Sequence, residues 1–102
     1  MDKLKDMLAD DPNDSFVRFA IAMEYKNVEM FEEAVLEFNS LKVLDANYVG
    51  LYYHLAHCYA ELQEEEAALI VYNDGIKIAE NLNDLHAKSE LMNAKINLEM
   101  GL

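Results

Sequence analysis

Apolar residues recur along most of the chain at intervals of three or four, the spacing that places them on one side of an α-helix. This periodicity predicts helices over roughly residues 14–26, 30–44, 48–61, 65–80 and 84–100. Polar segments of about four residues separate them, so consecutive helices are expected to run antiparallel. One proline and three glycines leave too few turn residues for a sandwich or barrel of strands. The fold class expected is therefore all-α.

The same pattern returns after 34 residues. Residues 15–48 align over residues 49–82 without a gap, and the coincidences fall on small and aromatic positions. Ala22 falls on Ala56, for example. Both positions are expected to be small because two helix backbones approach closely there. The asparagines of the connecting segments keep the same interval: Asn13, Asn47 and Asn81. An interval of this size predicts a stack of two-helix units.

Two stretches, "IAMEY…EEAVLEF…LDAN" and "LAHCY…EAALIVY…AENL", resemble the tetratricopeptide repeat, whose signature reads W-x2-L-G-x2-Y…A-x3-F…P. The resemblance implies a solenoid of antiparallel helix hairpins. Some positions depart from the signature: Arg18 and Tyr52 replace its tryptophan, and Glu29 and Gln63 occupy a turn position that often holds glycine. These departures concern the geometry of the turns more than the fold.

The chain is expected to form a single domain, which the 34-residue interval divides into four parts. Pro12 ends a short first helix that serves as a cap, and the last helix is expected to close the stack with a polar outer side. Asn81 and Asn83 are expected to form the turn that precedes this last helix. The parts are residues 1–12 (N-terminal cap helix), 15–48 (first repeat), 49–82 (second repeat) and 84–100 (C-terminal capping helix).

By the resemblance, the first helix of each repeat lines a concave groove. The groove is expected to be aromatic and apolar, with His54 at its edge, which suits a peptide or helix of a partner protein. The partner-binding residues expected are Phe16, Phe19, Met23, Lys26, Tyr53, His54 and His57. The alternative is a structural role, in which the apolar surface is used for self-association or is covered by the closing helix.

Twenty acidic residues against eight lysines and arginines give a formal charge of −12. This charge argues against binding to nucleic acid or to an anionic membrane and favours basic residues in a partner. No apolar run reaches the ~20 residues that cross a bilayer, and the first ten residues do not resemble a signal peptide. Cys58 is the only cysteine, so no internal disulfide is expected. A cytoplasmic protein is predicted.

The sequence contains no convincing catalytic or metal-binding constellation. "HLAHC" places His54, His57 and Cys58 close together on one helix, but histidines on such a surface more often pack than bind metal. The carboxylates of "QEEEAA" stand in the first turn of a helix, where they complement its dipole. We therefore expect no enzymatic activity, no cofactor and no metal.

Overall fold

The computed structural model describes residues 1–101, and over these residues it consists of six helices without a strand. The all-α prediction is confirmed. In chain order the helices are α1 (Asp2–Asp10), α2 (Ser15–Asn27), α3 (Phe31–Leu44), α4 (Gly50–Glu61), α5 (Glu65–Asn81) and α6 (Leu85–Glu99).

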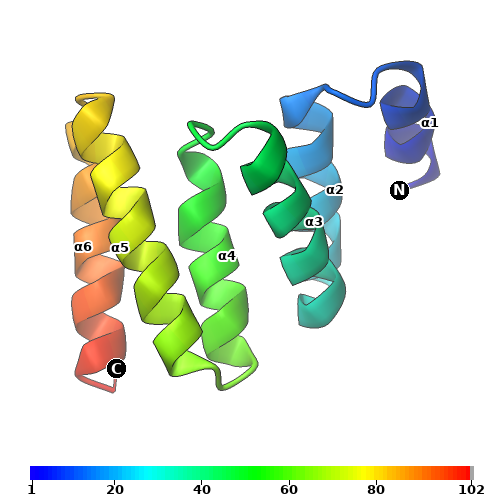
Figure 1. Cartoon of the computed structure of the whole chain (residues 1–102). Helices are drawn as coiled ribbons and strands as arrows, with labels where there is room; N and C mark the ends of the chain where they lie inside the picture. Colours follow the sequence, from blue (N-terminus) through cyan, green and yellow to red (C-terminus); the bar gives the residue numbers. More distant parts are fainter. Residues whose placement is uncertain (102) are drawn as a thin grey trace.

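From α2 to α6 each helix runs antiparallel to the next, and the helices lie side by side as an elongated slab (Figure 1). The slab measures 41 × 30 × 18 Å along its principal axes. α2 packs on α3 and α4 packs on α5 as hairpins, while α6 packs on α5. α4 also contacts α2 and α6, so these three helices form one layer, over which α3 and α5 lie. The arrangement is a helical repeat fold in which each unit packs on the next.

Small residues mark the places where helices cross closely. Ala22 of α2 and Ala34 of α3 are completely buried, and so are Ala56 of α4 and Ala68 of α5, which follow one period later. A larger side chain at such a crossing would force the backbones apart. One continuous apolar core, built around these crossings, joins α2 to α6.

Gly75 lies where α5 packs against both α4 and α6. A β-carbon built on it would lie 2.6 Å from Cβ of Tyr52 and 3.1 Å from Cδ1 of Leu91. Cβ of Tyr52 is the fixed base of a buried side chain, so it cannot swing out of the way. Glycine is therefore what allows the three helices to approach so closely at this point.

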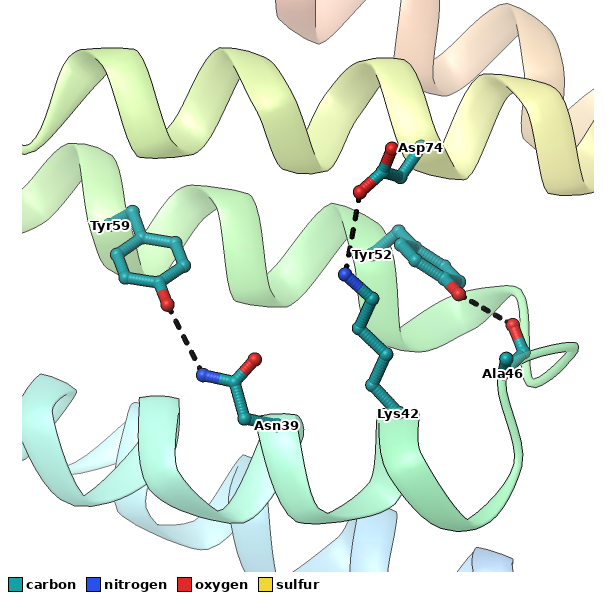
Figure 2. A network of polar contacts seen from close by, with 6 residues as sticks. All are labelled: Asn39, Lys42, Ala46, Tyr52, Tyr59 and Asp74. Carbon is teal, nitrogen blue, oxygen red and sulfur yellow. Dashed lines mark hydrogen bonds and ion pairs between the residues drawn. The ribbon is translucent and has the colours of Figure 1, made fainter.

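Two hydrogen bonds hold the second hairpin to the first (Figure 2). The hydroxyl of the buried Tyr52 donates to the backbone carbonyl of Ala46 over 2.6 Å, which satisfies the polar end of an otherwise apolar side chain. Nδ2 of Asn39 on α3 donates to the hydroxyl of Tyr59 on α4 over 3.2 Å. Both bonds cross from one unit to the next, so they help to set the angle at which the units stack.

The turns inside the two hairpins have the same geometry, one period apart. Glu29 and Gln63 adopt left-handed backbone conformations, with φ of 61° and 63°. In the first turn the N–H of Met30 donates to the carbonyl of Tyr25 over 2.9 Å, and the second turn repeats this bond. Glycine adopts the left-handed conformation without a steric cost, which explains why it is common at this position of the repeat. In Glu29 and Gln63 the same conformation strains the backbone.

α1 is the outermost helix and packs only on α2. None of its residues is buried. The helix ends before Pro12, and Asp14 caps α2 by accepting a 3.2 Å hydrogen bond from the N–H of Val17. No helix of the described residues is long and apolar enough to cross a membrane.

The connection between α5 and α6 differs from the prediction. α5 continues to Asn81, so the expectation that Asn81 forms the turn is wrong. In the first repeat the turn begins at Asp45, whereas the residue one period later is Ala79, a strong helix former that lets the helix run on. Asn83 does form the turn, with φ of 57°, a conformation that asparagine tolerates better than most residues.

The outer side of α6 is less polar than predicted. Its inward stripe packs on the core as expected: Ala87, Leu91, Ala94 and Leu98. However, Leu85, Met92 and Ile96 are 72%, 42% and 47% exposed. These three residues are also separated by helical intervals, so they form a second apolar stripe on another side of the same helix. The polar outer side expected of this helix is therefore interrupted by an apolar stripe.

We expect Gly75→Ala to destabilise the fold by about 1–3 kcal/mol, because overpacking outweighs the gain in helix propensity of about 1 kcal/mol. Gly50→Ala is the matched control, since a β-carbon there would meet Phe19 at 3.8 Å, an ordinary contact. Urea unfolding of the two variants measures both effects. A Gly75→Ala protein as stable as the wild type would show that this crossing can widen without cost.

Glycine at the two strained turn positions is expected to stabilise the protein. Glu29→Gly and Gln63→Gly should each raise the free energy of unfolding by up to ~1 kcal/mol, because relief of left-handed strain exceeds the entropy cost of glycine. Asn83→Gly should gain less, since asparagine already tolerates this conformation. Thermal unfolding followed by circular dichroism provides the comparison. A loss of stability in both hairpin-turn variants would contradict the strain.

Candidate functional site

The layer formed by α2, α4 and α6 carries the residues predicted to bind a partner. Between α4 and α6 it contains a cavity of about 250 Å³. Apolar and polar groups contribute to its lining in nearly equal shares. The lining residues are Tyr53, His57, Ala60 and Glu61 from α4, Tyr72 from α5, and Ala94, Asn97 and Leu98 from α6.

Two of the predicted binding residues, Tyr53 and His57, come together in this cavity. They stand one turn apart on α4, and the Tyr53 side chain is 37% exposed. Nε2 of His57 lies 3.4 Å from Oε1 of Glu61, so a carboxylate orients the imidazole. The ring of Phe31 on α3 meets the imidazole of His57 edge-on, with 6.5 Å between the ring centroids. The cavity therefore combines aromatic walls with one acidic group.

His54 lies between α2 and α4, and not at the edge of the groove as the sequence suggested. Its ring stacks on that of Phe38, with 6.2 Å between the ring centroids. It meets the rings of Phe19 and Tyr53 edge-on, with centroid distances of 5.7 and 5.4 Å. Nζ of Lys26 approaches its Nδ1 to 3.0 Å. These side chains fill the space between α2 and α4, so this part of the groove has a floor made by the protein itself.

The pKa values of the two histidines of α4, His54 and His57, are both lowered. Burial, followed by the positive charge of Lys26, lowers the pKa of His54 to about 4. Burial and Lys26 also lower the pKa of His57, although Glu61 acts in the opposite direction. A neutral His54 can accept a hydrogen bond from the Lys26 ammonium through Nδ1, which is the arrangement that the 3.0 Å separation shows. Lys26 therefore stands at the aromatic floor of the groove without a second positive charge from His54 beside it.

Phe16 and Met23 do not line the cavity. Phe16 stands in the first turn of α2 and is 68% exposed. Met23 is partly buried and packs against the core. The seven predicted residues therefore lie on two helices, α2 and α4. They contribute to two different places, the filled surface between α2 and α4 and the open cavity between α4 and α6.

The contribution of α6 to this site was missed in the sequence. Ala94, Asn97 and Leu98 form one wall of the cavity. The repeat interval contained a signal, because Ala94 follows Ala60 by one period and both line the cavity. The signature itself gives no sign of a third groove helix, because Ser89, Glu90 and Asn93 stand where its Leu, Gly and Tyr would fall. α6 takes the place of a third groove helix beside α4, and it lines the hollow instead of covering it.

The structure offers no support for chemistry at "HLAHC". Cys58 is completely buried, and burial raises the pKa of its thiol to about 11, so it is not an activated nucleophile. Among residues 1–101, no three histidine, cysteine or acidic side chains come together in a way that could hold a metal ion.

Comparisons with known proteins agree with the fold. A family model for the tetratricopeptide repeat matches residues 49–82, the same range as the second predicted repeat. No curated protein matches the chain. Among solved structures, a tetratricopeptide repeat domain protein from Salinibacter ruber, determined by NMR, is 36% identical with a TM-score of 0.81. That similarity covers 87% of this chain and 90% of the other.

Two further structures are similar. A crystal structure of a tetratricopeptide repeat domain protein from Salinibacter ruber is 35% identical, covers 84% of this chain and 97% of that chain, and has a TM-score of 0.79. A protein from Bordetella parapertussis has a TM-score of 0.88 over 98% of this chain and 87% of its own. At 20% identity, this last likeness concerns the fold alone.

The partly buried His54 makes stability depend on pH. Because the pKa of His54 falls from 6.5 in the unfolded chain to about 4 in the folded one, only the unfolded chain takes up a proton between these values. Stability is therefore expected to fall as the pH decreases from about 7.5 to 5.5, where most carboxylates do not yet titrate. His54→Gln should lose less stability over this range. Equal pH dependence in the two proteins, or an NMR titration of His54 near 6.5, would contradict this.

Proposed function

The chain belongs to the tetratricopeptide repeat family, whose fold suggests a protein–protein interaction module, and on this premise we propose that it binds an extended peptide segment of a partner protein. The segment lies along the surface of α2, α4 and α6 and places one apolar side chain in the cavity between α4 and α6. Members of this family are typically scaffolds without enzymatic activity, in agreement with the inert surroundings of Cys58.

The observation that carries this proposal is the cavity itself. A volume of about 250 Å³ is sufficient for one large apolar side chain and too small for most cofactors. Tyr53 and His57 offer flat aromatic surfaces for such a side chain. Asn97 stands on the facing wall, where its amide can both donate to and accept from a peptide backbone.

Charge defines the residues that flank the apolar one. The Glu61 carboxylate lies at the cavity and is 47% exposed, and the turn that follows it adds Glu64, Glu65 and Glu66. In a chain of charge −12, this edge favours a partner with lysine or arginine next to its apolar anchor. Such exposed charges contribute more to the rate and selectivity of association than to affinity.

The remaining predicted residues supply the path of the peptide beyond the cavity. Phe16 is exposed at one end of α2 and can pack against a second apolar side chain. Phe19, Met23, Lys26 and His54 form the surface between, of which Phe19 and His54 also support the protein's own core. Replacing Phe19 would therefore affect stability together with binding, so it is a poor test of the groove.

Selection of random peptides displayed on phage, with the purified protein immobilised, tests this proposal. Enriched peptides are expected to share an aromatic or large aliphatic residue beside lysine or arginine. For a selected peptide, Glu61→Lys should weaken binding about tenfold or more, whereas Glu64→Lys, with the same change in net charge, should weaken it less. Fluorescence polarisation measures the dissociation constants.

A second pair of variants tests the facing wall. Asn97→Ala should weaken binding of the same peptide, and Asn93→Ala, also on α6 but outside the cavity, should not. Equal effects within both pairs would mean that binding follows net charge or general surface properties. Selection without any shared motif would contradict a peptide-binding groove.

A further inference from the structure

A second hollow lies between α5 and α6, lined by a different set of α6 residues from those at the groove. Its volume is about 310 Å³, and its apolar lining consists of Ile76 from α5 with Met92 and Ile96 from α6. Met92 and Ile96 are 42% and 47% exposed, and Leu85, 72% exposed, continues their stripe towards the start of α6. We refer to this surface as the α5/α6 cleft. Its exposed apolar side chains lack a cover within residues 1–101.

The repeat itself indicates what shape fits the cleft. α5 packs on α4, the first helix of its own hairpin. Lys42 of α3 reaches α5, where its Nζ lies 3.4 Å from Oδ2 of Asp74 (Figure 2). Ile76 follows Lys42 by one period. By the same geometry, Ile76 faces the place where another helix would lie against α6, antiparallel to it. The cleft is thus shaped for an antiparallel helix with an apolar stripe.

The charges of the cleft indicate whose helix this is. Two of the eight basic residues of the chain, Lys88 and Lys95, line it, together with Glu80 and Glu99. The cleft is therefore balanced in charge, although the chain as a whole carries −12. Lys88 pairs with Glu80 of the same chain, with Nζ 3.3 Å from Oε2, whereas Lys95 and Glu99 can each meet their opposite on an identical copy across a two-fold axis. A strongly basic partner would instead find a better match at the acidic turns.

The chain also contains a helix of suitable length and pattern. α6 has 15 residues, which corresponds to about 22 Å, and it carries the exposed stripe of Leu85, Met92 and Ile96. α1 is the other helix with a free side, but it has nine residues and none of them is buried even against α2. An end-to-end stack through α1 is therefore the weaker match.

We propose that the protein forms a two-fold homodimer in which α6 of each copy packs antiparallel into the α5/α6 cleft of the other. A two-fold axis perpendicular to α6 makes the two α6 helices antiparallel, the direction that the cleft requires. Such an interface is isologous and closes after two copies. The cavity near Asn97 is lined by other α6 residues, so the dimer presents two open grooves and can bind a partner with two motifs more tightly than one.

Light scattering coupled to size exclusion, over a range of concentrations, tests this proposal. The wild-type protein is expected to reach, and not exceed, twice the 11.7 kDa mass of one chain. Ile96→Glu should shift the equilibrium to monomer, with a dissociation constant raised roughly 100-fold, because the charge enters the interface twice. Ile70→Glu is the matched control, since Ile70 is 57% exposed on α5 outside the cleft, and it should leave the dimer intact.

Disulfide trapping provides a readout that does not depend on a destabilising charge. In a Cys58→Ala background, Met92→Cys places a thiol near the middle of the stripe, where the two-fold axis brings it close to its own copy. Mild oxidation should yield a cross-linked dimer, whereas Ile70→Cys should not. A monomer at every concentration, a mass that keeps growing, equal effects of Ile96→Glu and Ile70→Glu, or failure of Met92→Cys to cross-link would each overturn the proposal.

Discussion

The structure depends on one constraint: a two-helix hairpin cannot bury its own apolar sides. Ala22 against Ala34 brings the helices of the first hairpin close together, but Phe38 and Leu41 are completely buried only because α4 packs on them as well. The second hairpin has the same requirement and meets it with α6, whose Leu91 packs beside Gly75. Stability therefore comes from the interfaces between units as much as from the units themselves.

This constraint also determines where binding surfaces arise. The helices of the layer of α2, α4 and α6 pack mainly on α3 and α5, so the size of their own side chains decides whether the space between two of them is filled. Between α2 and α4 that space is taken by the rings of Phe19 and His54. Between α4 and α6 it is open, because Ala60 and Ala94 stand at corresponding positions.

Within the described residues, α6 packs on the core with one side and leaves another side exposed. Its inward stripe completes the core, while a second stripe of Leu85, Met92 and Ile96 stays exposed beside α5. Both stripes follow from the same 3.6-residue period, but they meet different needs. The first belongs to folding, and the second is available for association. The cavity beside α4 and the cleft beside α5 therefore lie on different sides of one helix.

The amino-acid sequence by itself determined the helices, their order and the 34-residue interval, because apolar spacing, small crossing residues and turn residues are local features. It also located the strained turns, since Glu29 and Gln63 stand where glycine is common. What it left open was decided by packing between distant segments. The packing of His54 against three rings, the open wall formed by α6 and the exposed side of α6 all depend on how the helices face one another. Periodicity shows that a residue lies on an apolar side of a helix, but only the stacked structure decides whether another helix covers that side.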